Sequence, residues 1–266
     1  MRASAKKRTP VHDTRSINLL VKVGAMFDHV TIRVSDREAS EAFYNTVLAP
    51  LGIDQTYQLR TFSEWRDFSL AAADGDEPAT RRLHVAFVSP TREQVALFWR
   101  AGVDAGYTDA GPPGPRPDYL PDYYGAFLLD PDGNSVEAVH HGALRRDGVI
   151  DHLWIRVADL DATRRFYEAI APSAGLMVTR TDPDRVTLEG TSGSFSLVPG
   201  EPTQEVHLAF GTDDDAAVSA FHDAATGAGF QSNGPPGERP QYHPGYYAAY
   251  VLDPDGNNVE LVNHHR

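Results

Sequence analysis

The stretch that decides the fold, residues 234–265, reads GPPGERPQYHPGYYAAYVLDPDGNNVELVNHH. A loop rich in Tyr, His and Pro leads into an apolar strand, and a DPDGN turn reverses the chain into a second strand that carries Glu260. Pro fixes φ in such a turn, and Gly and Asn accept the left-handed conformation that closes a hairpin. The same passage stands 123 residues earlier, at residues 111–141, as GPPGPRPDYLPDYYGAFLLDPDGNSVEAVHH. The chain is therefore internally duplicated.

The duplication predicts two homologous halves, residues 26–143 and 149–266, joined by a short polar linker. Each half opens on an alternating strand, FDHVTIRV at 27–34 and IDHLWIRV at 150–157. Ser35 and Glu38 have the spacing of a capping box and predict the start of a helix. The pattern restarts at residue 83 with a strand and a helix that we expect Gly102 to end. The prediction is an α+β protein of four βαβββ units, whose sheets curl into cups.

Composition narrows the class of protein. The net charge is −13, although residues 1–25 are basic and are expected to form a disordered tail. The acidic remainder argues against a nucleic-acid partner, and no apolar run has the length of a membrane span. The chain has no Cys, which excludes disulfides and thiolate sites and fits a cytoplasmic location.

Both halves contain the pattern His-x54-His-x52-Glu on predicted strands, each time on the face opposite to the apolar neighbours. The residues are His29, His84 and Glu137 in the first half, and His152, His207 and Glu260 in the second. A lone His on a strand is more often a hydrogen-bonded core residue than a ligand. The two copies, however, differ freely between 54–66 and 177–189 and still agree at all three positions. The pattern therefore predicts a facial triad for a divalent ion, with Fe, Mn, Zn, Ni and Co as candidates.

The motifs DHVTIRVSD…FY, DHLWIRVADL…FY and DPDGN-x-VE resemble the vicinal oxygen chelate superfamily, which includes glyoxalase I, fosfomycin-resistance transferases, bleomycin-resistance proteins and extradiol dioxygenases. The likeness covers nearly all of residues 26–266, and the chain looks like two small proteins of the glyoxalase/bleomycin resistance/dioxygenase type fused together. The resemblance implies that the six residues occupy the metal positions of the fosfomycin-resistance and extradiol types. Glyoxalase I has a further carboxylate where Ser69 and Ser196 stand here, which argues against that particular reaction.

The resemblance implies a metal-dependent enzyme for a small substrate with vicinal oxygens, either an isomerase, lyase or transferase or a ring-cleaving dioxygenase. The alternative is a non-catalytic protein that sequesters an aromatic or basic small molecule in an acidic, Tyr-rich cup. The triads can form within each half, or by exchange, with His29 joining His207 and Glu260. The exchanged form is favoured because a fused pair mimics a fosfomycin-resistance dimer. A monomer with pseudo-dimeric halves and a homodimer both remain open.

The loop before the last hairpin distinguishes the two predicted sites. In the second half, His243 is a candidate general acid or base, and Tyr242 and Tyr246 are candidate phenol donors. Leu120 stands at the place of His243 in the first half and cannot transfer a proton. We therefore expect the site with Glu260 to be active and the site with Glu137 to be weakened or structural.

Several neighbouring residues receive simpler interpretations. Asp28 and Asp151 precede a predicted ligand and are expected to be turn or strand-end residues. The histidine pair His140 and His141 is assigned to the edge of the linker, and the histidine pair His264 and His265 to a solvated chain end.

Overall fold

The computed structural model describes residues 26–59, 61–75, 77–191 and 193–265. The basic tail expected at residues 1–25 lies outside these ranges. Among the described helices, none is both long and apolar enough to cross a membrane.

The described chain forms four βαβββ units, as predicted. The first unit contains β1 (His29–Val34), α1 (Arg37–Leu48), the 3-10 turn η1 (Ala49–Leu51), β2 (Tyr57–Gln58), β3 (Phe62–Trp65) and β4 (Phe68–Ala72). The second contains β5 (His84–Val88), α2 (Arg92–Asp104), β6 (Thr108–Pro115), β7 (Tyr124–Leu129) and β8 (Ser135–His140). The third contains β9 (Ile150–Val157), α3 (Leu160–Ala174), β10 (Met177–Asp182), β11 (Arg185–Glu189) and β12 (Ser194–Pro199). The fourth contains β13 (Val206–Thr212), α4 (Asp215–Gly227), β14 (Ser232–Glu238), β15 (Tyr247–Leu252) and β16 (Asn258–Asn263).

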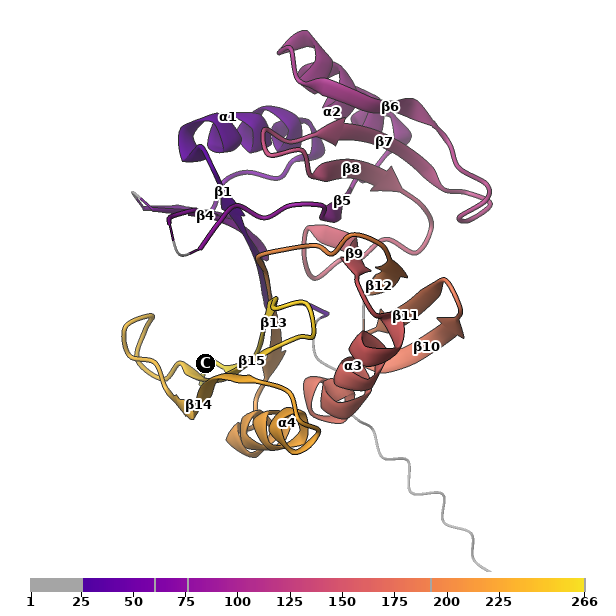
Figure 1. The fold of residues 1–266 in the computed structure, drawn as a ribbon. Coiled ribbons are helices and arrows are strands. Elements are labelled where there is room, and N and C mark those ends of the chain that lie inside the picture. Colours follow the sequence, from indigo (N-terminus) through magenta and orange to yellow (C-terminus); the bar gives the residue numbers. More distant parts are fainter. Residues whose placement is uncertain (1–25, 60, 76, 192, 266) are drawn as a thin grey trace, which may run out of the picture.

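The units combine across the two halves into two open, eight-stranded mixed sheets. One sheet has the order β14-β15-β16-β13-β1-β4-β3-β2 and the other β10-β11-β12-β9-β5-β8-β7-β6. The first unit thus joins the fourth through antiparallel β1 and β13, and the second joins the third through antiparallel β5 and β9. The helices instead pair within a half, α1 with α2 and α3 with α4, at opposite ends of the molecule (Figure 1). Each half therefore contributes one unit to each sheet.

The alternation of β1 explains how one strand serves both the core and the cup. Val30, Ile32 and Val34 are buried, whereas the alternate residues are only half-buried. On the buried face, α1 contributes Phe43 and Tyr44, which lie at right angles to each other within the main hydrophobic cluster. This burial fixes the register of the strand, because a shift of one residue would turn His29 into the core.

Two predicted helix boundaries are wrong. Asp36, not Ser35, caps α1 by accepting a hydrogen bond from the Ala39 amide, while the Ser35 amide donates to Asp132. Gly102 does not end α2, which continues to Asp104. Gly102 instead allows β7 to approach, since an added Cβ would lie 2.3 Å from Leu128 Cδ1.

The second DPDGN turn, at residues 253–257, reverses the chain and also holds the last hairpin in place by hydrogen bonds. The Asp253 carboxylate accepts from the backbone amides of Asp255 and Asn257, at 2.9 and 2.8 Å. The Asn257 side chain donates to the Thr203 carbonyl and accepts from the Val206 amide. The turn thus ties the last hairpin to the start of β13 and fixes the height of Glu260 in the sheet.

The linker between the halves is polar, as expected, but it is not merely a solvated connection. Arg145 within it is buried, and its Nη1 lies 2.6 Å from Asp67 Oδ2. The same guanidinium donates to the carbonyls of Ile150 and Phe27. One side chain therefore joins the linker, the first unit and the third unit.

Candidate metal centre

The six predicted ligands gather into two groups, each assembled from both halves. The Glu260 centre consists of His29, His207 and Glu260, and the Glu137 centre consists of His84, His152 and Glu137. Within each group, one potential ligand atom of every residue lies within 4.8 Å of the others. This is the exchanged arrangement, and it follows from the sheet order, because β1 lies beside β13 and β9 beside β5.

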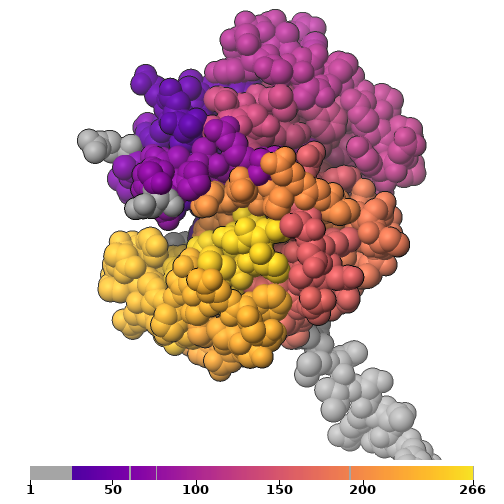
Figure 2. All heavy atoms as spheres, viewed as in Figure 1, coloured from indigo at the N-terminus to yellow at the C-terminus, as the bar shows by residue number. Residues whose placement is uncertain are grey.

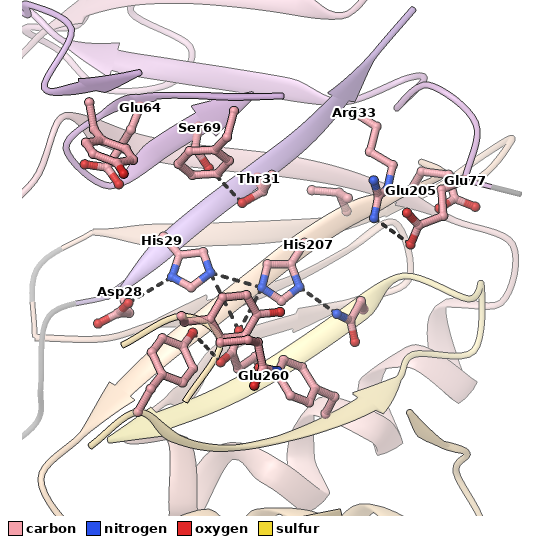
Figure 3. Close-up of a pocket in the computed structure, with 18 of the residues that line it drawn as sticks. Asp28, His29, Thr31, Arg33, Glu64, Ser69, Glu77, Glu205, His207 and Glu260 are labelled. Carbon is pink, nitrogen blue, oxygen red and sulfur yellow. Dashed lines mark hydrogen bonds and ion pairs between the residues drawn. The ribbon is translucent and has the colours of Figure 1, made fainter. Parts of the chain in front are cut away.

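The Glu260 centre lies on three adjacent strands. In the registers of β1, β13 and β16, Thr31 lies opposite His207, and Ala209 lies opposite Glu260. The three candidate ligands consequently project from neighbouring strands into the same cup (Figure 3).

The distances between the donor atoms fit a single divalent ion. His29 Nε2 lies 3.1 Å from His207 Nε2, and Glu260 Oε2 lies 2.9 Å from His207 Nε2 and 3.6 Å from His29 Nε2. Ligands about 2.1 Å from an ion, at octahedral to tetrahedral angles, lie roughly 3.0–3.4 Å from one another. Two imidazoles and a carboxylate in this arrangement are the donor set of a facial triad.

Each member of the Glu260 centre is held by a neighbour. His29 Nδ1 donates to Asp28 Oδ1 at 2.9 Å, which leaves the Nε2 lone pair of a neutral ring directed into the cup. His207 Nδ1 lies 2.8 Å from the amide of Asn258, and the Tyr246 hydroxyl donates to Glu260 Oε1 at 2.7 Å. The interpretation of Asp28 as only a strand-end residue is therefore wrong.

The electrostatics favour the ligand forms of His207 and Glu260. Burial lowers the pKa of His207 and keeps its ring neutral. Burial alone would raise the pKa of Glu260, but its contacts with His207, nearby His29 and the Tyr246 hydroxyl together lower it. For His29, burial opposes protonation, whereas Asp28 and Glu260 outweigh it and raise the pKa. The Glu260 carboxylate thus stays ionised beside a neutral His207, and these are the forms that bind a cation.

A cavity of about 1030 Å³ opens above the Glu260 centre. It lies between the β2–β4 segment and the loop before β15, and Figure 2 shows these purple and gold segments facing each other across a hollow. Tyr250 lines this cavity and is only 9% exposed, and its hydroxyl makes no hydrogen bond of standard geometry within the described residues. The hydroxyl faces the Glu260 carboxylate, and burial together with that charge raises the pKa of Tyr250. A buried hydroxyl without such a bond is costly, so it marks a position where a bound molecule supplies the missing contact. Sequence reasoning missed Tyr250, whose spacing in β15 looked like core.

The cavity has a charged end and an apolar rim. Arg33 projects into it and pairs with Glu77, with 2.6 Å between Nη2 and Oε1 (Figure 3). Glu64 also lines the cavity, from the position on β3 opposite Ser69. At the rim, exposed Tyr57 and Leu59 provide apolar surface.

The three residues predicted to act in catalysis occupy different places. His243 lines the cavity and lies 2.9 Å from His264, measured from Nε2 to Nδ1. Tyr246 contacts the Glu260 carboxylate and thus holds a candidate ligand, while Tyr242 is 62% exposed at the rim. His264 was assigned to a solvated chain end, and this is wrong, because its Nε2 lies 2.9 Å from Asp28 Oδ2.

The Glu137 centre repeats the same framework. Glu137 Oε2 lies 3.1 Å from His84 Nε2 and 3.7 Å from His152 Nε2. Asp151 lies 2.8 Å from His152 Nδ1 and also contacts His141, which is buried and is not a loose linker edge as expected.

The cup above the Glu137 centre is lined differently. Trp154 occupies the place that Thr31 has in the other copy, and its ring centre lies 6.2 Å from that of His84 and 6.1 Å from that of Tyr119. The Arg185 guanidinium lies 4.2 Å from the centre of the Trp154 ring. Phe127 replaces Tyr250, so the hydroxyl is absent as well. The cup above the Glu137 centre is therefore lined by larger side chains than the cup above the Glu260 centre, since Trp154 stands in place of Thr31.

The family model for the Glyoxalase/Bleomycin resistance protein/Dioxygenase superfamily matches residues 26–138 and 149–261. The chain belongs to this superfamily, of which it contains two tandem domains. The exact limits of the halves remain a prediction.

Solved structures share the fold over most of the chain. Glyoxalase I from Zea mays has 19% identity and a TM-score of 0.64, covering 90% of this chain and 92% of its own. A single-substitution variant of the same enzyme has 20% identity and a TM-score of 0.66, and the match covers 90% of this chain and 92% of the variant. A candidate dioxygenase from Bacillus subtilis has 15% sequence identity and a TM-score of 0.62. The match covers 92% of this chain and 87% of the Bacillus subtilis chain. No curated protein matches the chain. At these identities, the likenesses establish the fold and leave the reaction open.

Proposed function

We propose that this protein is a metal-dependent enzyme that acts on a small substrate with vicinal oxygens at the Glu260 centre. The observation that carries the proposal is the convergence of His29 Nε2, His207 Nε2 and Glu260 Oε2 at the floor of a cavity. An ion bound there supplies Lewis-acid chemistry or, if it is Fe(II), the activation of dioxygen.

The residues around the centre have separable roles in this proposal. Asp28 and Tyr246 orient His29 and Glu260. The Tyr250 hydroxyl, which makes no hydrogen bond of standard geometry within the described residues, can donate to a substrate oxygen beside Glu260. The apolar rim accommodates the rest of the substrate, which favours a molecule with an oxygen-rich end and an aromatic or aliphatic end.

Among the possible reactions, ring-cleaving dioxygenation of a catechol is favoured over the glyoxalase I reaction. Three protein ligands leave open positions for a bidentate substrate and a further small molecule. Ser69, which stands where the resemblance to glyoxalase I requires a carboxylate, instead shares a hydrogen bond of 2.7 Å with Thr31. An isomerase, lyase or transferase reaction is the alternative for an ion other than Fe(II).

We assign a structural role to the Glu137 centre. Its ligand set is complete, so we expect it to hold an ion, but Trp154 replaces the small Thr31 of the other centre and should leave less room for a substrate. Turnover should therefore depend on one centre while metal content depends on both.

Metal analysis followed by an activity screen tests the proposal. Protein purified without added metal is analysed for bound metals, and oxygen uptake is then measured with a panel of catechols after Fe(II) loading. Glu260→Gln should abolish turnover, whereas the matched Glu137→Gln should retain most of it. Equal losses in the two variants would contradict the asymmetry. A protein that binds no divalent metal, yet holds aromatic or basic small molecules, would contradict an enzymatic role and support sequestration.

A further inference from the structure

One wall of the cavity above the Glu260 centre places a carboxylate beside two aromatic rings. Tyr57, Phe62 and Glu64 all line this cavity. Tyr57 lies directly opposite Glu64 in the register of β2 and β3, and Phe62 projects from the same face of β3 as Glu64. Directly opposed residues have Cβ atoms roughly 5 Å apart, so the three side chains form one surface, which we call the β3 patch.

The Glu64 carboxylate forms no ion pair among the described residues. It is half-buried, and its Oε1 accepts a hydrogen bond of 3.0 Å from the Thr56 hydroxyl. Arg33, at the charged end of the cavity, is paired with Glu77 instead. A partly desolvated carboxylate attracts a cation, and the faces of aromatic rings add to that attraction. The β3 patch therefore has the chemistry of a site for an ammonium group.

The cavity as a whole is acidic. Among the described residues that line it, five are carboxylates and two are arginines, so with neutral histidines its walls carry a net charge of −3. A divalent ion at the Glu260 centre would leave a net charge of −1. The buried Tyr250 hydroxyl, which makes no hydrogen bond of standard geometry within the described chain, lies in the same cavity and independently indicates a bound molecule. The charge of the walls disfavours an anionic molecule and favours a cationic one.

The corresponding wall of the Glu137 cup has the opposite charge. At the three positions of the β3 patch, in the matching register, β10 and β11 carry Arg180, Arg185 and Thr187. The Arg185 guanidinium lies 4.2 Å from the centre of the Trp154 ring. The Glu137 cup thus supplies its own cation to an aromatic ring, whereas the Glu260 cup supplies aromatic rings and a carboxylate without a cation.

We infer that the β3 patch binds a protonated amine, and that the substrate of the Glu260 centre is a catechol with an amine on a short side arm. The catechol part rests on the proposed function, whereas the preference for a cation at the β3 patch does not. Glu64 projects from the β3 side of the cavity and Glu260 from the β16 side, so one molecule can contact both (Figure 3). The ammonium group donates to the Glu64 carboxylate, and the methylene groups of the arm lie against Tyr57 and Phe62.

Titrations with three catechols that differ in the charge of the side arm test the inference. The probes carry an aminoethyl arm, a neutral propyl arm of the same length, and an anionic carboxymethyl arm. Calorimetry measures their affinities at neutral pH without oxygen, for the Zn(II)-loaded and for the metal-free chain. We expect the aminoethyl catechol to bind about 10- to 100-fold more tightly than the propyl catechol, as for a hydrogen bond to a charged group, and the carboxymethyl catechol to bind most weakly.

Glu64→Gln keeps the size of the side chain and removes its charge. It should weaken binding of the aminoethyl catechol by about 10-fold or more and leave the affinity for the propyl catechol unchanged. Glu189→Gln is the matched control, because Glu189 also accepts a hydrogen bond of 3.0 Å from a threonine, Thr179, but is exposed and does not line the cavity. It should change neither affinity.

Equal affinities of the wild-type chain for the aminoethyl and propyl catechols, binding of neither, or an equal loss of both in Glu64→Gln would overturn the inference. The metal-free titrations separate this result from the proposed function. A preference for the aminoethyl catechol that persists without metal, in a chain that turns over no catechol, would support the β3 patch and contradict the enzyme. Turnover of the propyl catechol without any preference for charge would do the reverse.

Discussion

His29 shows how a single strand residue becomes a candidate ligand. Its Nδ1 is engaged by Asp28, so the other nitrogen of the neutral ring can only accept, and the strand directs it toward His207. A carboxylate behind a ligating histidine fixes the tautomer and raises the basicity of the ring. The repeat predicted His29, but Asp28 looked like a strand end, because only the structure reveals which side of the ring it touches.

Asp28→Asn should weaken metal binding at the Glu260 centre by about 10- to 100-fold, since an amide holds the His29 ring less firmly and adds no negative charge. Competitive titration with a chromophoric chelator measures this affinity. The matched Asp151→Asn should weaken the Glu137 centre alone. An Asp28→Asn protein with wild-type affinity at both centres would contradict the role assigned to Asp28.

Tyr250→Phe removes only the hydroxyl, and it copies Phe127 of the other half. We expect kcat/KM to fall by about 10- to 100-fold, as for loss of a hydrogen bond to a charged substrate oxygen. Metal affinity and thermal stability should change much less than kcat/KM, because the hydroxyl makes no hydrogen bond of standard geometry within the described residues. Steady-state kinetics measures kcat/KM, and a melting curve measures the thermal stability. An unchanged kcat/KM would contradict a contact between Tyr250 and the substrate.

At the scale of elements, the sequence predicted the βαβββ order well and the helix ends poorly. The alternation of buried and half-buried residues in β1 and the DPDGN turns depend on residues that are close together in the sequence, so the sequence predicts them. Gly102 was misread as a helix end because its role depends on Leu128, a contact with a distant strand. His264 was misread for the same reason, since Asp28 lies 236 residues away.

Arg145 is an element-scale contact with a measurable cost. Arg145→Met leaves the buried Asp67 carboxylate without its cationic partner, with the Val149 amide still donating to it, and breaking a buried ion pair in this way costs about 3–5 kcal/mol. Urea denaturation should therefore give a lower free energy of unfolding by about that amount. Arg146, the exposed neighbour of Arg145, provides a control. Arg146→Met should change the free energy of unfolding by less than about 0.5 kcal/mol. Equally small changes in the free energy of unfolding for Arg145→Met and Arg146→Met would contradict a stabilising role for the linker.

At the scale of the molecule, the exchange of units between halves determines where the centres are. Helices of each half pack together, while its strands divide between two sheets. The positions of the residues alone could not decide between grouping within a half and exchange, and the preference for exchange came from the family resemblance of a fused pair to a dimer. Equivalent residues occur at matching positions in both halves, and the alternation of β1 and β9 is satisfied by either pairing. The non-local pairing of β1 with β13 resolves this choice in favour of exchange.

Metal stoichiometry in two double variants tests this central claim most directly. The wild-type chain should bind two Zn(II) ions in isothermal titration. His29→Ala combined with Glu260→Gln damages one centre and should leave one ion bound, whereas His29→Ala combined with Glu137→Gln damages both and should leave none. The opposite result, one ion retained by the second variant and none by the first, would contradict centres built across the two halves.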